Sequence, residues 1–183
     1  MSAETPLFIM RDTRSDLGYN AMFWSQGSGY NSHIDKARRF TLEEAQAIHD
    51  SRRTDIPILL SCAEAISYPA IDVQHISKAE SVSYAGDEFI IQRANMYNGN
   101  YIHYISQDAA NDGQLYTDNY SKAQAYTLHQ ALSIAADGSG LVMWPKSYFD
   151  DRVTKCAPIS LIDNQAMGFD HGIKENKLEK VPA

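Results

Sequence analysis

Basic side chains gather in the first third of the sequence and could bind phosphate groups or an acidic protein surface. They are Arg11, Arg14, Lys36, Arg38, Arg39, Arg52 and Arg53. A guanidinium group presents several fixed donors that match phosphate and carboxylate geometry. A second interpretation is local ion pairing with neighbouring acids, which are Asp12, Asp16, Asp35, Asp50 and Asp55. The candidate partner-binding arginines are Arg38, Arg39, Arg52 and Arg53.

Tyrosine is abundant, with 11 in 183 residues, and its apolar ring and polar tip suit binding interfaces. Around residues 97–104, tyrosines and a histidine alternate with apolar residues. This alternation indicates that one face of an expected hairpin is exposed. Tyr97 and Tyr101 therefore join the candidate partner-binding residues.

The segment 30–48 recurs, with changes, as the segment 116–134. The matched positions are Tyr30/Tyr116, Lys36/Lys122, Ala37/Ala123, Phe40/Tyr126, Thr41/Thr127, Leu42/Leu128, Ala45/Ala131 and Ile48/Ile134. Self-similarity of this kind indicates a duplicated structural unit. Two copies can place equivalent residues around one small ligand, such as a nucleotide signal. The candidates for this alternative are Tyr30, Lys36, Tyr116 and Lys122.

The sequence contains no pattern that is typical of a catalytic or metal site. The six histidines form no HExxH motif and have no partner cysteine cluster. The glycine-containing loops 27–29 and 137–140 match neither a phosphate-binding fingerprint nor a nucleophile elbow. We therefore expect no catalytic residue, no metal and no cofactor, and the sequence favours a binding protein over an enzyme.

Composition indicates a globular protein with an acidic surface. Lys and Arg number 16 against 23 Asp and Glu, and the net charge of −7 opposes direct binding to nucleic acid. Cys62 and Cys156 fall at non-equivalent places in the two copies, which favours reduced thiols in a cytoplasmic protein. No secretory signal or membrane span is visible, so we expect the protein to lie in the cytoplasm. We expect it to be a monomer or a homodimer.

Each copy is expected to begin with a β-hairpin and continue into a helix. Residues 7–11 and 19–25 predict the first hairpin; residues 88–96 and 100–106 predict the second, around an Asn98-Gly99 type I′ turn. Thr41 with Glu44, and Thr127 with Gln130, fit the capping box at a helix start.

Short extended segments are expected after each helix. Ile56-Pro57 is matched with Trp144-Pro145, and brief strands are predicted over 70–76, 157–162 and 82–85. The predicted organisation is a first repeat (1–76), a linker (77–87), a second repeat (88–163) and a polar C-terminal tail (164–183). The predicted fold class is α+β, with two tandem hairpin-plus-helix repeats packed about a pseudo-twofold axis.

The first copy resembles a group of small uncharacterised proteins of tailed bacteriophages and prophages. The resemblance lies in F-W-S-Q-G-S-G-Y (23–30), K-A-R-R-F-T-L-E-E-A (36–45) and T-D-I-P (54–57). The second copy is less similar, with a longer loop and with Tyr104 matched to Trp24. The resemblance implies a phage context and transfers no catalytic residue.

Two functions follow as hypotheses. In the first, the chain is a non-enzymatic phage-type protein that inhibits or modulates a host protein or nucleoprotein complex, such as a defence system, in the host cytoplasm. In the second, it binds or sequesters a small ligand such as a nucleotide signal. A structural phage component is a further alternative.

Overall fold

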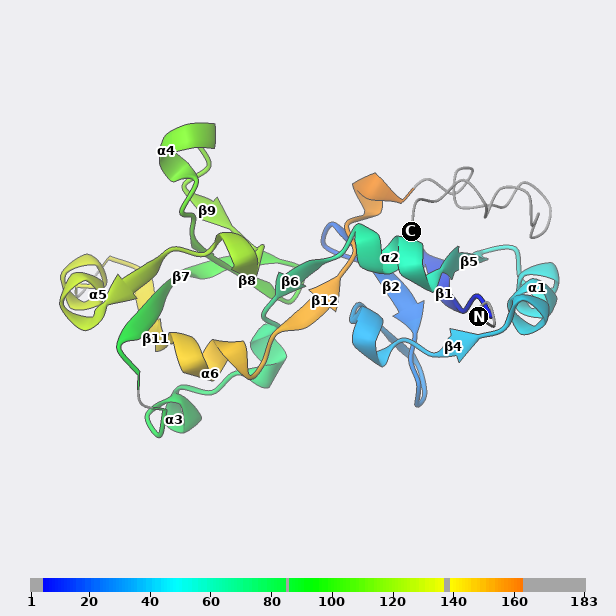
Figure 1. The fold of residues 1–183 in the computed structure, drawn as a ribbon, viewed down its shortest axis with the longest axis horizontal. Coiled ribbons are helices and arrows are strands. Elements are labelled where there is room, and N and C mark those ends of the chain that lie inside the picture. The colour runs from blue at the N-terminus through cyan, green and yellow to red at the C-terminus, as the bar shows by residue number, and fades with distance from the viewer. Residues whose placement is uncertain (1–4, 85, 137–138, 163–183) are drawn as a thin grey trace. The chain divides into compact units, whose positions relative to one another are not determined.

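Packing divides the chain into two compact units. Unit 1 comprises Met1–Ser67 and Lys155–Ala183, and unit 2 comprises Tyr68–Thr154. The computed structural model describes residues 5–84, 86–136 and 139–162 of these units (Figure 1). The predicted tail, 164–183, lies outside the described residues.

Unit 1 is built on a long N-terminal strand with a helix near its end. Its elements in the first part of the chain are β1 (Phe8–Leu17), β2 (Asn20–Trp24), β3 (Tyr30–Asn31), η1 (Ile34–Lys36), β4 (Arg39–Phe40), α1 (Leu42–Ser51), β5 (Asp55–Leu59) and α2 (Leu60–Ala65). The chain returns to it along β12 (Thr154–Cys156) and η4 (Ile159–Leu161).

After a short entry segment, unit 2 repeats this order of elements with one added helix, α4, between its second and third strands. The entry segment contains β6 (Tyr68–Ala70), η2 (Val73–His75) and α3 (Lys78–Ser81). The following elements are β7 (Glu88–Asn98), β8 (Tyr101–Ile105), α4 (Ala109–Asp112), β9 (Tyr116–Thr117), η3 (Tyr120–Lys122), β10 (Ala125–Thr127), α5 (Leu128–Ile134), β11 (Leu141–Pro145) and α6 (Lys146–Asp150). Among the described residues, no helix has the length and apolar character needed to span a membrane.

The two units contain antiparallel sheets of the same topology. In unit 1, β1 pairs with β2, β4 and β5, and β2 pairs with β3. In unit 2, β7 pairs with β8, β10 and β11, and β8 pairs with β9. The α+β class and the tandem hairpin-plus-helix repeat are therefore confirmed. The pseudo-twofold axis stays a prediction.

Both predicted hairpins form, but the second turn differs from the expected type. The loop between β7 and β8 consists of Gly99 and Asn100, because Asn98 already pairs with Tyr101. Gly99 has a φ of 61° and stands at the first central position, which is the requirement of a type II′ turn. Gly18 fills the same position in the first hairpin, with a φ of 63°.

Both predicted capping boxes are present. Thr41 and Glu44 cap α1 reciprocally, and Thr127 and Gln130 do the same for α5. In α1, Ala45 is buried and its neighbours Leu42 and Ile48 pack on the core, as the helical spacing predicts. The face of α5 is less covered, because Leu128 is 49% exposed.

Several predicted strand segments are shifted or wrong. The strands expected over 70–76 and 157–162 lie earlier, as β6 and β12, and 3₁₀ helices follow them. The strand expected over 82–85 is wrong for the residues the structure describes, since helix α3 ends at Ser81 and a turn follows. Residue 85 itself lies outside the described residues.

Strand register also corrects two matched positions between the copies. Ile58 pairs with Ile9 and Trp144 with Ile90, so Trp144 is equivalent to Ile58 rather than to Ile56. Phe23 pairs with Arg11 and Tyr104 with Gln92, so Tyr104 is equivalent to Phe23. The residue equivalent to Trp24 is Ile105, which pairs with Tyr116 as Trp24 pairs with Tyr30.

The last segment of each copy completes the unit built by the other copy. In unit 2, Ile102 N donates to Ile71 O (3.2 Å), although residue 71 falls in the predicted first repeat. In unit 1, Ala21 N donates to Ala157 O (3.0 Å), although residue 157 falls in the predicted second repeat. Each packing unit therefore contains residues from both sequence repeats.

Tyr120 joins the aromatic core of unit 2. Its ring meets Tyr104 and Phe149 edge-on, at centroid distances of 5.7 and 6.1 Å, and its hydroxyl donates to Asp150 Oδ1 (2.7 Å). Burial, followed by the hydrogen bond with Asp150, raises the pKa of Tyr120 above its ordinary value. The folded state therefore favours the protonated phenol.

This raised pKa predicts a loss of stability in alkali. The stabilising contribution is complete below the unfolded tyrosine pKa of about 10 and is lost as the pH rises toward the folded pKa. Urea unfolding between neutral pH and pH values above 10 should therefore show a steeper decline in wild type than in Tyr120→Phe. Tyr19→Phe, at a side chain that is 79% exposed, is the matched control and should decline like wild type. Equal decline in all three proteins would contradict the prediction.

Candidate functional site

A tyrosine hydroxyl in unit 1 joins two arginine–aspartate ion pairs. Arg14 Nη2 and Arg52 Nη2 both donate to Tyr30 Oη, each at 3.0 Å. Arg14 binds Asp12 with two hydrogen bonds, of 2.8 and 3.0 Å, and Arg52 Nε donates to Asp55 Oδ2 (2.5 Å). We call Asp12, Arg14, Tyr30, Arg52 and Asp55 the arginine–tyrosine cluster.

The fold brings the cluster together through strand register. Asp12 and Asp55 are directly opposite one another in the β1–β5 ladder. Like charges at such a position repel, so the two arginines neutralise a local conflict. Arg14 reaches Asp12 because β1 bulges: its pairing with β2 passes from Asp12↔Met22 to Asp16↔Ala21.

The two aspartates are buried and the two arginines reach solvent. Asp12 and Asp55 side chains are 3% and 0% exposed, whereas Arg14 and Arg52 side chains are 48% and 38% exposed. The hydrogen bond to Asp12 raises the pKa of Arg14, and hydrogen bonds with Tyr30 and then Asp55 raise the pKa of Arg52. Both guanidinium groups are therefore held in place by buried acceptors and stay charged.

Donor capacity remains on both arginines. Arg14 and Arg52 use only Nε and Nη2 for their contacts in the part of the chain that the structure describes. Each Nη1 group keeps two N–H donors. Because the hydroxyl of Tyr30 accepts from both arginines, its own proton also remains available. These donors flank the same partly exposed hydroxyl.

The Asp12 carboxylate predicts a specific loss of stability in acid. The hydrogen bonds from Arg14 lower the pKa of Asp12 below its ordinary value. Its stabilising contribution is therefore complete above the unfolded value of about 3.9 and is lost as the pH falls through the folded pKa. As the pH is lowered from 5, the free energy of unfolding measured in urea should fall more steeply for wild type than for Arg14→Met. A parallel decline of the two proteins would contradict the assignment.

A cavity of about 380 Å³ opens beside the cluster. Its lining residues are Trp24, Ala47, Ile48, Ser51, Arg52 and Asp55. Arg52 lies over the Trp24 ring, with its guanidinium carbon 5.2 Å from the centroid, and Trp24 meets Tyr30 edge-on. The cavity is within the size range of small-molecule sites.

Two buried polar atoms belong to residues that line this cavity. Asp55 Oδ1 and Trp24 Nε1 are buried and have no hydrogen-bond partner among the described residues. Leaving such groups unpaired costs about 1–3 kcal/mol each. Asp55 Oδ1 is an acceptor and Trp24 Nε1 a donor, and neither atom is accessible to solvent.

Local ion pairing, the second interpretation of the basic residues, is confirmed for four arginines. Besides Arg14 and Arg52, Arg11 pairs with Asp16 and Arg53 with Asp50, each at 3.3 Å. Arg38 stacks on Phe40 at 5.0 Å and is exposed, like Arg39.

The four candidate partner-binding arginines flank helix α1 in the sequence. Arg38 and Arg39 precede helix α1, whereas Arg52 and Arg53 follow its last residue. Arg38 N donates to Trp24 O (2.8 Å), and the guanidinium group of Arg52 lies over the Trp24 ring, so a member of each pair contacts Trp24. Only Arg52 belongs to the arginine–tyrosine cluster.

The tyrosine candidates of unit 2 divide into exposed and buried residues. Tyr97 is 45% exposed, as predicted, but Tyr101 is completely buried, so its predicted exposure is wrong. Tyr101 follows the turn of the hairpin, where its backbone bridges to Asp72. Lys122 pairs with Asp108 at 3.3 Å.

The cluster is not duplicated in unit 2, although Tyr116 is equivalent to Tyr30. By strand register, Arg93 stands in place of Asp12, Asn95 in place of Arg14 and Leu141 in place of Asp55. Ile105 replaces Trp24, as described above. The ligand-binding alternative therefore gains support in unit 1 through Tyr30, while Lys36, Tyr116 and Lys122 lie outside the cluster.

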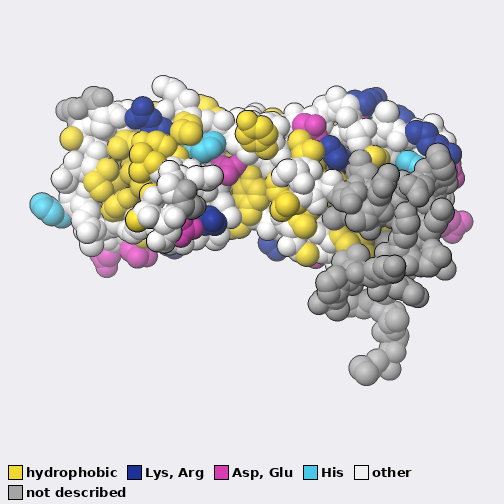
Figure 2. All heavy atoms as spheres, turned by 90° about the horizontal axis from the view of Figure 1, so that it is seen from above, with side chains coloured by type: hydrophobic (Ala, Val, Ile, Leu, Met, Phe, Trp, Pro, Cys, Tyr) yellow, Lys and Arg dark blue, Asp and Glu magenta, His cyan; other side chains and the backbone are white. Residues whose placement is uncertain are grey.

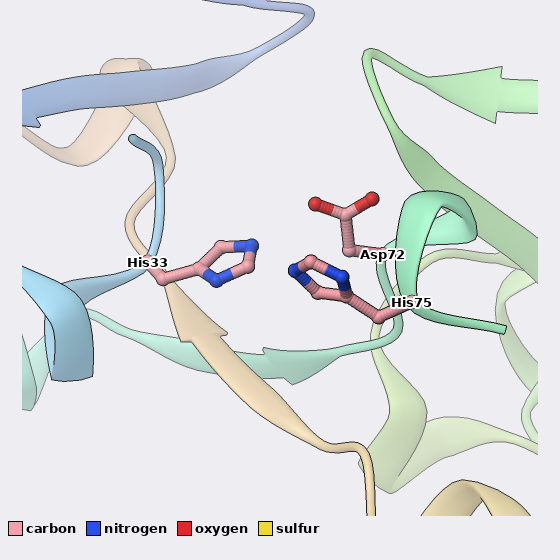
Figure 3. Close-up of side chains that lie close together, drawn as sticks. All are labelled: His33, Asp72 and His75. Carbon is pink, nitrogen blue, oxygen red and sulfur yellow. The ribbon is translucent and has the colours of Figure 1, made fainter. Parts of the chain in front are cut away.

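Histidine and aspartate side chains with metal-binding capacity occur in both units. Asp72 and His75, drawn in Figure 3, belong to unit 2. Asp72 Oδ1 caps η2 by accepting from Gln74 N (2.8 Å). His33 belongs to unit 1, at the N-cap of η1. The two residues of unit 2 supply fewer than the three protein ligands of a typical zinc site.

The sequence singles out Arg14, Tyr30 and Arg52, but it does not place Trp24 or Asp55 beside them. For Asp55 the sequence predicts only an ion pair. The signal for it was available, since a carboxylate opens an apolar strand, I-P-I-L, and becomes buried there. Trp24 offered no signal beyond its residue type.

No protein-family model, curated protein or solved structure matches this chain. The resemblance to phage proteins therefore stays a prediction from the sequence motifs.

Proposed function

We propose that the chain is a non-enzymatic binding protein whose unit 1 binds the anionic group of a small molecule at the arginine–tyrosine cluster. The observation that carries this proposal is the convergence of Arg14 and Arg52 on the hydroxyl of Tyr30. Their free Nη1 donors and the Tyr30 proton can surround a phosphate or carboxylate with charge-assisted hydrogen bonds. This is the small-ligand hypothesis, restricted to one unit.

Preorganisation supports binding here more than net charge does. Asp12 and Asp55 neutralise the two arginines, so the cluster carries no excess positive charge. They also fix both guanidinium groups, and a fixed side chain loses little rotamer entropy when a ligand arrives. A ligand would therefore be recognised by donor geometry, and its affinity should depend only moderately on salt.

The test is a melting experiment with inorganic pyrophosphate. A ligand that binds only the folded state raises the melting temperature, with a stabilisation of about 2.7 kcal/mol at a hundredfold excess over Kd. We expect this rise in wild type and in Arg53→Met, and a loss of it in Arg14→Met. Potassium chloride of equal ionic strength controls for the general effect of salt.

Two results would reject the proposal. One is an equal rise in Arg14→Met and wild type, which would place any binding elsewhere. The other is no rise beyond the chloride control at millimolar pyrophosphate. Arg53 is the suitable control because it is an exposed arginine with its own ion pair, outside the cluster.

A second candidate function is protein binding through unit 2. Figure 2 shows hydrophobic side chains gathered on one face of this unit. Its exposed large hydrophobic residues include Leu115, Leu128 and Leu132, at 53, 49 and 56% exposure. Large exposed apolar patches mark interaction surfaces. The partner proposed here is a host protein or nucleoprotein complex in the host cytoplasm, in line with the phage context.

Helix α5 provides the variant for this second candidate. Leu128 and Leu132 are four residues apart and so lie on the same side of the helix. A pull-down from host lysate should retain a stoichiometric protein with wild type and lose it with Leu128→Lys/Leu132→Lys. Arg38→Ala/Arg39→Ala tests the basic surface in parallel. The absence of any stoichiometric protein with wild type would remove this candidate.

A further inference from the structure

The cavity beside the arginine–tyrosine cluster presents a single charged side chain to solvent. Of its lining residues, only Arg52 and Asp55 carry a charge. The Asp55 side chain is fully buried and is bound by Arg52, whose own side chain is 38% exposed. Arg52 is also a member of the cluster, so a ligand whose anionic group binds there can extend directly into the cavity.

The remaining lining residues are uncharged, and most of them are apolar. They are Trp24, Ala47, Ile48 and Ser51. Ala47 and Ser51 are exposed, and Trp24 and Ile48 are only partly buried, so a ligand can reach this wall from solvent. An apolar group placed against it would remove apolar surface from water on both sides, which favours binding.

We propose that the ligand of unit 1 is an organic phosphate monoester whose ester group is uncharged and apolar. The phosphate binds Arg14 and Arg52, and the ester group lies in the cavity against the Trp24 ring and Ala47. A phosphate suits the cluster better than a carboxylate, because its three terminal oxygens can accept from both arginines and from Tyr30 at once. This inference rests on the proposed function and names its ligand class.

The asymmetry between the two copies gives the stoichiometry. In the strand register of unit 2, Asn95 stands in place of Arg14 and Ile105 in place of Trp24. Unit 2 therefore lacks the combination of an arginine pair and an aromatic wall, and each chain should bind one ligand.

Calorimetry on the full-length wild-type chain compares phosphate monoesters of equal charge. Butyl phosphate carries the apolar group, methyl phosphate lacks most of it, and glycerol 3-phosphate replaces it by a polar group of similar size. Burying one methylene group completely strengthens binding about fourfold. The additional methylene groups of butyl phosphate are only partly buried in an open cavity. We therefore expect butyl phosphate to bind at one site per chain, about tenfold more tightly than either control.

Ala47→Gln provides the protein variant. Glutamine favours a helix nearly as well as alanine does, and at this exposed position it places a polar amide on the cavity wall. The advantage of butyl over methyl phosphate should fall to about threefold or less. Methyl phosphate should bind the variant as it binds wild type. Ala65→Gln, at an exposed alanine of α2 outside the cavity lining, is the matched control and should behave like wild type.

The outcomes separate this inference from the proposed function. If butyl phosphate binds no more tightly than methyl phosphate or glycerol 3-phosphate, or if its advantage is unchanged in Ala47→Gln, the ligand class is wrong while anion binding stands. A failure of butyl phosphate to bind where pyrophosphate binds would overturn the ligand class in the same way. If pyrophosphate also fails to bind, the proposed function falls with it.

Discussion

Replacement of Trp144 by alanine is expected to destabilise the protein by about 3–5 kcal/mol, because it empties a tightly packed aromatic core. Trp144 is 5% exposed, and its ring stacks on that of Tyr148. The ring centroid of Trp144 lies 5.7 Å from that of Tyr148 and 5.3 Å from that of Phe149. Its Nε1 donates to Gln92 Oε1 (2.8 Å) in the interior. Alanine therefore removes packing and also leaves a buried amide oxygen without its donor.

Trp144→Phe separates these two contributions. Phenylalanine keeps most of the ring contacts and loses the hydrogen bond to Gln92, so we expect a smaller cost of about 1–3 kcal/mol. The measurement is urea unfolding, followed by far-UV circular dichroism. A loss below about 1 kcal/mol for alanine would contradict the packing described for unit 2.

Arg52→Ala is expected to abolish anion binding and to destabilise the fold together. The change leaves the fully buried carboxylate of Asp55 without its counter-ion. Breaking a buried ion pair costs about 3–5 kcal/mol, and we expect about 2–3 kcal/mol because the Arg52 side chain is more than one-third exposed. Pyrophosphate should no longer raise the melting temperature of this variant.

The second copy of the repeat suggests a variant that divides stability from binding. Leucine occupies the position of Asp55 there, at Leu141, so this fold accepts an apolar residue at that point of the sheet. Replacing a buried ion pair by apolar residues is often neutral or stabilising. Arg52→Met/Asp55→Leu should therefore recover the stability lost in Arg52→Ala while binding stays absent.

Two results with the double variant would contradict this prediction. If it binds pyrophosphate like wild type, the cluster is a structural ion-pair network and the proposed site is wrong. If it remains as unstable as Arg52→Ala, then the buried carboxylate is not the source of the instability.

Local chemistry in the sequence predicted the elements that depend on local interactions. The two capping boxes formed at Thr41 and Thr127 because their hydrogen bonds connect residues three positions apart. The hairpins formed for the same reason. The matched pair Tyr30/Tyr116 also holds, since both residues occupy the same place in the strand register.

Features that depend on long-range packing could not be read from the sequence. One such feature is that residue 71 packs in unit 2 and residue 157 in unit 1, although each belongs to the other sequence repeat. The local sequence around these residues does not indicate which of the two hairpins they pair with. The pairing of Asp12 with Asp55 depends on the register of two strands that are distant in sequence. Alternation alone predicts an exposed Tyr101, but this residue is buried and its backbone bridges to Asp72, which is distant in the sequence.

The central claim is that Arg14 and Arg52 bind an anion directly, and NMR of arginine side chains tests it most directly. The Nε–Hε signals of ¹⁵N-labelled wild-type protein are followed during titration with pyrophosphate. We predict saturable shifts of the Arg14 and Arg52 signals at one ligand per chain, with the signals of Arg39 and Arg53 nearly unchanged. Uniform small shifts of all arginines, or shifts confined to arginines outside the arginine–tyrosine cluster, would contradict the account.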